Sequence, residues 1–261
     1  MKYLNPFISD VILRIDFAEK EETIKNSLQQ DFIDECLKKF PIKEIYKKTE
    51  KQVTVSNNSD SIEHDTVINT EIFNEWHFKD VNKENELIVT HSFFVIHIKK
   101  YSTYQEIRKI FIDLFGKLSE LYPSIKGNRF GLRYIDKINL INERKPSATW
   151  FDFWKKYINK DILGNLKYST CERNLSRCLS VIEMNFEEYM FRFQYGIHNQ
   201  DYPAIVKKEI FILDADLYSM GLFDINDIRI LIDKFHEKAK EWFENSITDN
   251  LREKMGIITN E

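Results

Sequence analysis

The sequence predicts an α+β fold: two β-α-β-β-β-α units forming one curved, mainly antiparallel sheet with helices on one face, in a saddle-like or helix-grip-like layout. Strand-like alternation and helix-like periodicity follow one another along the whole chain. The same order of elements occurs twice, which indicates an internal repeat. Only 7 glycines and 5 prolines occur in 261 residues, so no long flexible linker between the units is expected.

The first unit occupies residues 1–125. Its opening strand, residues 10–17, alternates apolar and polar side chains as a half-buried strand does. Helical spacing of apolar residues follows until Pro41 ends it. Three strands parted by polar loops, the longest at 56–65, and a second helix complete the unit. We expect the helices at 21–39 and 103–121, and these strands at about 42–56, 67–80 and 85–99.

The second unit, residues 126–261, repeats this order. Short matches support the duplication: Leu13-Arg14 corresponds to Leu132-Arg133 at nearly the same offset as Ile107-Arg108 to Ile228-Arg229. Hairpin-linked strands form antiparallel sheet and each helix must bury its apolar stripe, so both units are expected to pack as one globular body. We expect strands at 130–138, 177–186, 189–198 and 206–217, an aromatic-rich helix at 149–158 and a long helix at 225–255.

Composition narrows the function classes. The net charge is −4, residues 1–125 carry the acidic excess, and neither unit has the basic surplus that phosphate binding requires. Nucleic-acid binding by the open sheet face is therefore kept only as a second alternative. Cys36, Cys171 and Cys178 form no CxxC pair, which favours a reducing, cytoplasmic location, and no apolar run is long enough to span a membrane.

Catalytic and cofactor motifs are missing from the sequence. The chain has no glycine-rich phosphate loop, no HExxH and no nucleophile elbow, so no cofactor, metal or catalytic residue is predicted. A non-enzymatic role is favoured on this basis.

Arg14 and Arg133 are the first candidate binding residues. Alternation places both opposite the apolar face, at equivalent positions of the repeat. Two guanidinium groups on an open sheet would hold a carboxylate, a phosphate or an acidic partner. Alternatively, each pairs with a neighbouring carboxylate, Asp16 or Asp136, and only satisfies a half-covered sheet.

Asp214 and Asp216 form a DxD pattern on a predicted strand. Because residues two apart share a strand face, both carboxylates would suit a cation such as Mg²⁺. Pairing with Arg14 and Arg133 across the same face is the simpler expectation, and no metal site is predicted here.

The predicted helix at 149–158 is unusually aromatic. Trp150 and Trp154 belong to a cluster with Phe151, Phe153 and Tyr157, more rings than one buried stripe needs. Two apolar faces indicate contact with a partner or with the other unit, and internal packing is the alternative. The long terminal helix is a second place where a partner or a second copy of the chain would pack, so a homodimer is considered.

Several motifs resemble a sporadically distributed, uncharacterised prokaryotic protein family. They are Asn5-Pro6, the segment Phe130 to Ile135, the segment Leu213 to Tyr218, and the ending from Ile247-Thr248-Asp249 to Gly256. The family typically carries Glu where this chain has Asp10. Its patchy distribution implies a setting in mobile elements, antiphage defence or toxin–antitoxin systems.

We therefore expect a non-enzymatic binding or adaptor protein that engages a macromolecular partner, most simply another protein. The first alternative is an enzyme or sensor of a small anionic, nucleotide-like ligand. The expected binding residues are Arg14, Asp16, Arg133, Asp136, Asp214 and Asp216 on the open face, and Trp150 and Trp154 on the aromatic helix.

Overall fold

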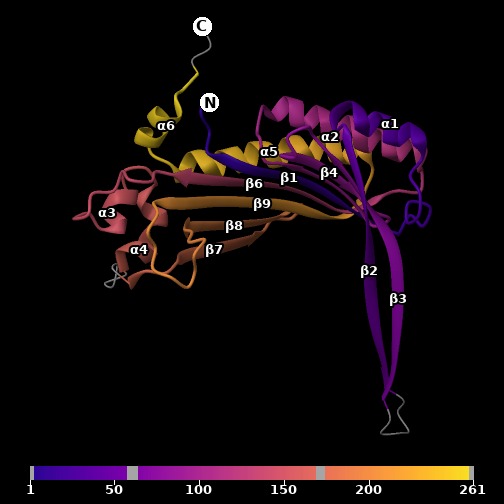
Figure 1. The fold of residues 1–261 in the computed structure, drawn as a ribbon. Coiled ribbons are helices and arrows are strands. Elements are labelled where there is room, and N and C mark those ends of the chain that lie inside the picture. Colours follow the sequence, from indigo (N-terminus) through magenta and orange to yellow (C-terminus); the bar gives the residue numbers. More distant parts are fainter. Residues whose placement is uncertain (1–2, 58–63, 169–173, 259–261) are drawn as a thin grey trace.

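The computed structural model describes residues 3–57, 64–168 and 174–258 (Figure 1). The predicted loop at 56–65 lies partly, and Cys171 entirely, outside these residues. Within them the chain has an α+β fold with one nine-stranded antiparallel sheet in the order β2-β3-β4-β5-β1-β6-β9-β8-β7. The predicted class, α+β with an antiparallel sheet, is confirmed.

The elements follow one another in a simple order along the chain. The strands are β1 (Ile8–Phe17), β2 (Ile42–Asn57), β3 (His64–Lys79), β4 (Asn85–Val89), β5 (Phe93–Ile98), β6 (Gly127–Asn139), β7 (Cys178–Asn185), β8 (Met190–Ile197) and β9 (Ile210–Phe223). The helices are α1 (Gln30–Lys39), α2 (Tyr104–Leu121), α3 (Trp150–Trp154), α4 (Gly164–Tyr168), α5 (Ile225–Ser246) and α6 (Asp249–Met255), with a 3₁₀ turn at Lys160–Ile162.

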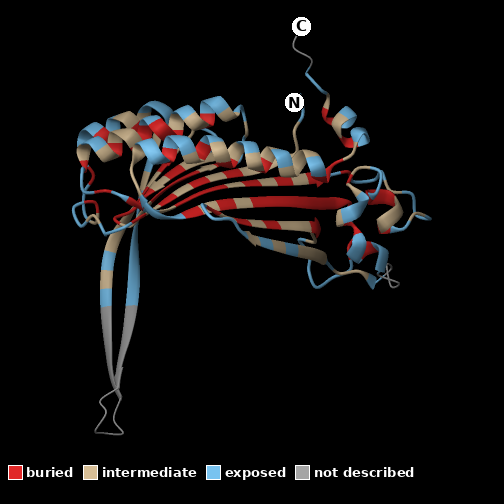
Figure 2. Ribbon diagram, turned by 180° about the vertical axis from the view of Figure 1, so that it is seen from behind, coloured by how far each residue is buried: buried red, intermediate tan, exposed pale blue. Residues whose placement is uncertain are grey.

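The first strand of each half meets the other at the centre of the sheet. β1 pairs with β6, with Leu13 opposite Leu132, and β5 and β9 flank this pair. Alternate residues of β1 and β6 are buried, and α1, α2 and α5 lie over that face (Figures 1 and 2). The strand pleat thus gives the sheet one face packed against helices and one half-buried face without them.

Side-chain caps fix where the covering helices begin. The Thr103 hydroxyl accepts a hydrogen bond from the backbone N–H of Glu106 at the start of α2. At the start of α5, Asp224 and Asp227 form a reciprocal capping box. Both caps satisfy backbone donors that the first helical turn leaves unpaired.

Two predicted elements are shorter than expected because tertiary contacts interrupt them. The helix predicted at 21–39 begins only at Gln30, since the carbonyl of Ile24 accepts a hydrogen bond from the Trp76 indole instead. The strand predicted at 85–99 divides into β4 and β5 at a turn where the Thr90 hydroxyl accepts from the N–H groups of Ser92 and Phe93.

Two predicted helices also end early. The helix predicted at 149–158 stops at Trp154, and the one predicted at 225–255 breaks into α5 and α6. Ile158, after the first helix, and Ile247, after α5, pair with each other in an isolated antiparallel bridge. This bridge lies at both helix ends. The Thr248 hydroxyl then donates to the Lys156 carbonyl, which holds the break in place.

The β2–β3 hairpin projects from the sheet as a long arm (Figure 1). Its strands have 16 residues each and pair from Ile42–Lys79 to Asn57–His64. Only Trp76 to Lys79 of β3 pair with β4, and β2 is the edge strand of the sheet. We call residues 42–57 and 64–79 the arm. Among the described helices, none combines the length and apolarity needed to cross a membrane.

Candidate ligand-binding site

Arg14 and Asp16, predicted to lie on the open sheet face, pair with each other there. The Arg14 Nε lies 2.8 Å from an Asp16 carboxylate oxygen, and its guanidinium stacks 4.4 Å from the Phe93 ring centroid. Arg129 approaches the same carboxylate at 3.7 Å. The Arg14 guanidinium is therefore already held by a neighbouring carboxylate, which was the alternative considered for it.

Arg133 is held by the DxD pattern of β9. Its Nε and Nη2 atoms contact the two carboxylate oxygens of Asp214 at 2.7 and 2.6 Å, a bidentate pair. Asp216 lies opposite Arg133 on the neighbouring strand, and burial raises its pKa while Arg129 and Arg133 act in the other direction. The structure thus brings Arg133, Asp214 and Asp216 together as an internally paired group.

Asp136 does not share the open face with Arg133, contrary to the prediction. Residues three apart on a strand point to opposite sides, so Asp136 lies with Leu132 and Tyr134 on the face beneath the helices. It is 6% exposed. Asp136 therefore belongs to a different site from the arginines.

Trp150 and Trp154, predicted to contact a partner, are buried inside the protein. Their exposed fractions are 3% and 0%. The Arg144 guanidinium stacks on Trp150 at 4.0 Å, and Trp154 packs against Phe211 of β9 at 5.1 Å between ring centroids. These aromatics fill the core beside β9, so internal packing accounts for them.

A cavity of about 380 Å³ lies on the helix-covered side, and Asp136 is part of its wall. Its lining comes from the N-terminal segment, the residues before α2, strands β6 and β9, and helix α5. Apolar and aromatic groups form most of the wall, as in typical small-molecule sites. The aromatic residues that line it include Tyr101, Tyr104, Tyr134, Phe193 and Phe243.

Asp136 is the unusual group of this cavity. Within the described residues, its carboxyl makes no hydrogen bond or ion pair, and burial alone raises its pKa to about 8. A buried carboxylate without a partner is strongly disfavoured, so the group keeps its proton at neutral pH. The cavity therefore contains a neutral carboxylic acid that would ionise readily beside a cation.

His236 forms the neighbouring polar group, on the cavity side of α5. Its Nδ1 lies 2.9 Å from the Tyr134 hydroxyl, and its ring stacks on Tyr104 with centroids 3.6 Å apart. Burial lowers the pKa of His236 to about 4, so the ring is uncharged at pH 7. Tyr104 is fixed in turn by a hydrogen bond to Asp233, which Arg108 also binds at 2.7 and 2.8 Å.

The other charged side chains of the lining are already paired, since Lys240 lies 3.4 Å from a Glu237 carboxylate oxygen. Glu237 and Glu244 carry carboxylates, and Lys240 supplies an ammonium group. Glu244 is already engaged, since it accepts from the Tyr3 hydroxyl at 2.8 Å and pairs with Arg252 at 3.0 Å. With His236 neutral, no cation contacts the Asp136 carboxyl among the described residues.

Sequence reasoning named Asp136 but missed Tyr134, His236 and Tyr104. Tyr134 could have been predicted to lie beside Asp136, because residues two apart on one strand share a face. His236 follows Ile232 by four residues, so a polar side chain within the apolar stripe of α5 was a visible signal. Tyr104 gave none, because its position depends on how α2 packs on α5.

Comparison of the sequence with known families and curated proteins identified no relative. No family of proteins matches the chain, and no curated protein matches it in sequence.

We expect Asp136→Asn to stabilise the protein, and to do so more as the pH rises. In the wild type, the folded state holds the proton up to about pH 8 while the unfolded state loses it near 3.8, so stability falls as pH rises through this interval. The amide has no proton to lose. The variant's gain in unfolding free energy should be at least ~2 kcal/mol larger at pH 9 than at pH 5, measured by urea denaturation.

Asp214→Asn on the opposite sheet face is the matched control for this experiment. It breaks the bidentate pair with Arg133 and should destabilise the protein at both pH values. A gain for Asp136→Asn that is the same at pH 5 and pH 9 would contradict the assignment.

Proposed function

We propose that this protein binds a small organic cation, an amine attached to an apolar or aromatic body, in the cavity between β6, β9 and α5. The observation that carries the proposal is the uncompensated carboxyl of Asp136 in an aromatic-lined cavity. An ammonium group beside Asp136 would restore its ionisation, and the surrounding rings offer faces to the same cation.

The charge of the ligand distinguishes this proposal from the anionic alternative. Arg14 and Arg133, the guanidinium groups expected to clamp an anion, are paired with Asp16 and Asp214 on the other face of the sheet. In the cavity wall Lys240 pairs with Glu237 and Glu244 pairs with Arg252, so among the described residues no unpaired cation is available to an anion. An anion would find no counter-ion there, whereas a cation would gain the buried Asp136 carboxylate.

Proton release provides a specific test. At pH 7 an amine that binds beside Asp136 should expel close to one proton, because it lowers the carboxyl pKa from about 8 to below the ambient pH. We expect this for tyramine, measured by calorimetry in buffers of different ionisation enthalpy. Neutral 4-ethylphenol should release none, and 3-(4-hydroxyphenyl)propionate should bind least.

Asp136→Asn should weaken tyramine binding by ~10-fold or more and abolish the proton release. Asp216→Asn, on the opposite face, should change neither. Equal affinity for the amine and the matched acid, or tyramine binding that is unaffected by Asp136→Asn, would sink the proposal.

A second candidate function is the engagement of a protein partner, as an adaptor, through the arm. The specific observation is the free edge of β2, which is a 16-residue strand at the margin of the sheet. An open edge offers a row of backbone donors and acceptors to an extended segment of another chain. We propose strand addition along β2 as the mode, in a cytoplasmic setting, with a role in antiphage defence or a toxin–antitoxin system as the context that the family resemblance implies.

Replacing residues 52–69 by Asn-Gly should weaken this binding without unfolding the body, because it removes the outer part of the β2 edge. Lys51 lies opposite Thr70, so the two-residue turn closes the shortened hairpin in register. We expect a purified partner to protect the β2 amides from hydrogen exchange in the full chain, and to bind the shortened chain at least ~10-fold more weakly. Equal affinity for both chains would exclude the outer part of the arm, residues 52–57 and 64–69.

The two halves of the chain share matched sequence positions at the centre of the sheet. We propose that residues 1–125 and 126–261 are copies of one unit, joined through β1 and β6 into a curved, saddle-like platform. Support comes from the matched positions of Leu13-Arg14 and Leu132-Arg133, which lie on the two paired strands.

A further inference from the structure

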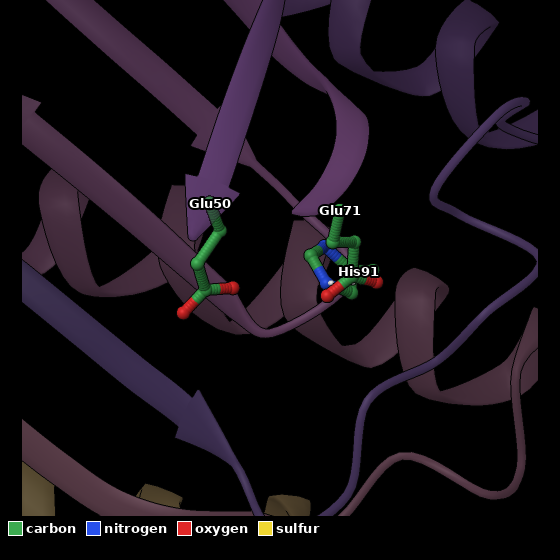
Figure 3. A group of neighbouring side chains, drawn as sticks. All are labelled: Glu50, Glu71 and His91. Atoms are coloured by element: carbon green, nitrogen blue, oxygen red, sulfur yellow. Dashed lines mark ion pairs between the residues drawn. The ribbon is translucent and has the colours of Figure 1, made fainter. Parts of the chain in front are cut away.

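Three side chains converge where the arm leaves the sheet. Glu50 of β2 lies opposite Glu71 of β3, and His91 lies in the turn between β4 and β5. One ligand atom of each lies within 4.8 Å of the others. Figure 3 shows Glu71 and His91 overlapping, with the Glu50 carboxylate to one side. The group joins both strands of the arm to the body of the protein.

His91 is the observation that points to a ligand. Its side chain is 1% exposed, and within the described residues neither ring nitrogen makes a hydrogen bond. A buried polar group without a partner is unfavourable, because it has given up its hydrogen bonds to water. Its Nε2 lies 3.5 Å from a Glu71 carboxylate oxygen, too far for a hydrogen bond but directed into the cluster. A metal ion would supply the missing partner.

We propose that Glu50, Glu71 and His91 bind a divalent transition-metal ion of the Zn²⁺ class, which clamps the base of the arm to the β4–β5 turn. One imidazole and two carboxylates form a ligand set that Zn²⁺ accepts. Zn²⁺ bonds of about 2.0–2.2 Å require ligand atoms no more than about 4 Å apart. The Glu50 side chain is 57% exposed, so packing does not prevent it from rotating toward the other two ligands.

Lys20 marks the cation position in this cluster. Its Nζ lies 2.6 Å from Glu71 and 3.2 Å from Glu50, so one ammonium group bridges the two carboxylates. Lys25 contacts Glu71 as well, at 2.8 Å. A metal ion would displace the flexible Lys20 side chain, which makes Lys20 a competitor.

Because Lys20 competes with the metal ion, its removal should raise the metal affinity, whereas removal of a ligand should lower it. Zn²⁺ is titrated into the full chain at pH 7.5 against a chromophoric chelator, and Co²⁺ absorption reports the ligand geometry. We expect one equivalent bound by the wild type, and affinity lowered by more than about 10-fold in Glu50→Gln and in His91→Gln. Lys20→Met should raise the affinity by roughly 10-fold, because it removes the competing ammonium.

His198→Gln provides the control for histidines elsewhere on the chain and should leave the affinity unchanged. Glu50→Gln changes an exposed side chain, so its result stands even where His91→Gln alters folding. The proposal is overturned by Zn²⁺ binding that is absent in the wild type, or equal in the wild type and Glu50→Gln, or lowered in Lys20→Met.

Discussion

The alternation of side chains along β6 places Arg133 and Asp136 on opposite faces of the sheet. Arg133 points to the open side, where Asp214 neutralises it through two hydrogen bonds. Asp136, three residues later, points beneath α5, where burial raises the pKa of its carboxyl. One strand thus supplies a satisfied ion pair to one face and an unsatisfied acid to the other. The cavity chemistry follows from that difference.

The arm and the cavity use different parts of the fold. The arm departs from the β2 edge, whereas the cavity lies beside β6, β9 and α5. Interactions at the arm base are mainly ionic, and they join the exposed Lys20 and Glu50 side chains to Glu71. Those around the cavity are largely aromatic, as the stacking of His236 on Tyr104 shows. The two features can therefore be tested separately by mutation.

The sequence indicates the class of fold because local periodicity survives in most elements. Residues 10–17 and 130–138 alternate as strands and form β1 and β6. Tertiary contacts limit the rest. Ile24 and Leu28 have helical spacing and are buried, yet their segment packs against Trp76 without forming a helix. Trp154 is core because Phe211 lies beside it, and a distant strand partner leaves no local signal in the sequence.

The candidate sites were less predictable than the fold, because they too depend on tertiary contacts. Parity along the strand separates Asp136 from Arg133, so their grouping was an avoidable error. His91 is different, because its burial arises from the turn at 90–92 packing near Glu71 and Phe73 of the arm. No periodic pattern surrounds it in the sequence. Sites formed by loops and arm bases depend on long-range packing that one sequence does not encode locally.

The most direct measurement is a ¹³C NMR titration of the Asp136 carboxyl in the full chain, assigned by the loss of its resonance in Asp136→Asn. The account predicts a midpoint near pH 8 for the protein alone. A midpoint near the ordinary aspartate value of about 4 would show that the carboxyl is solvated or paired, and the proposed cation site would have no basis.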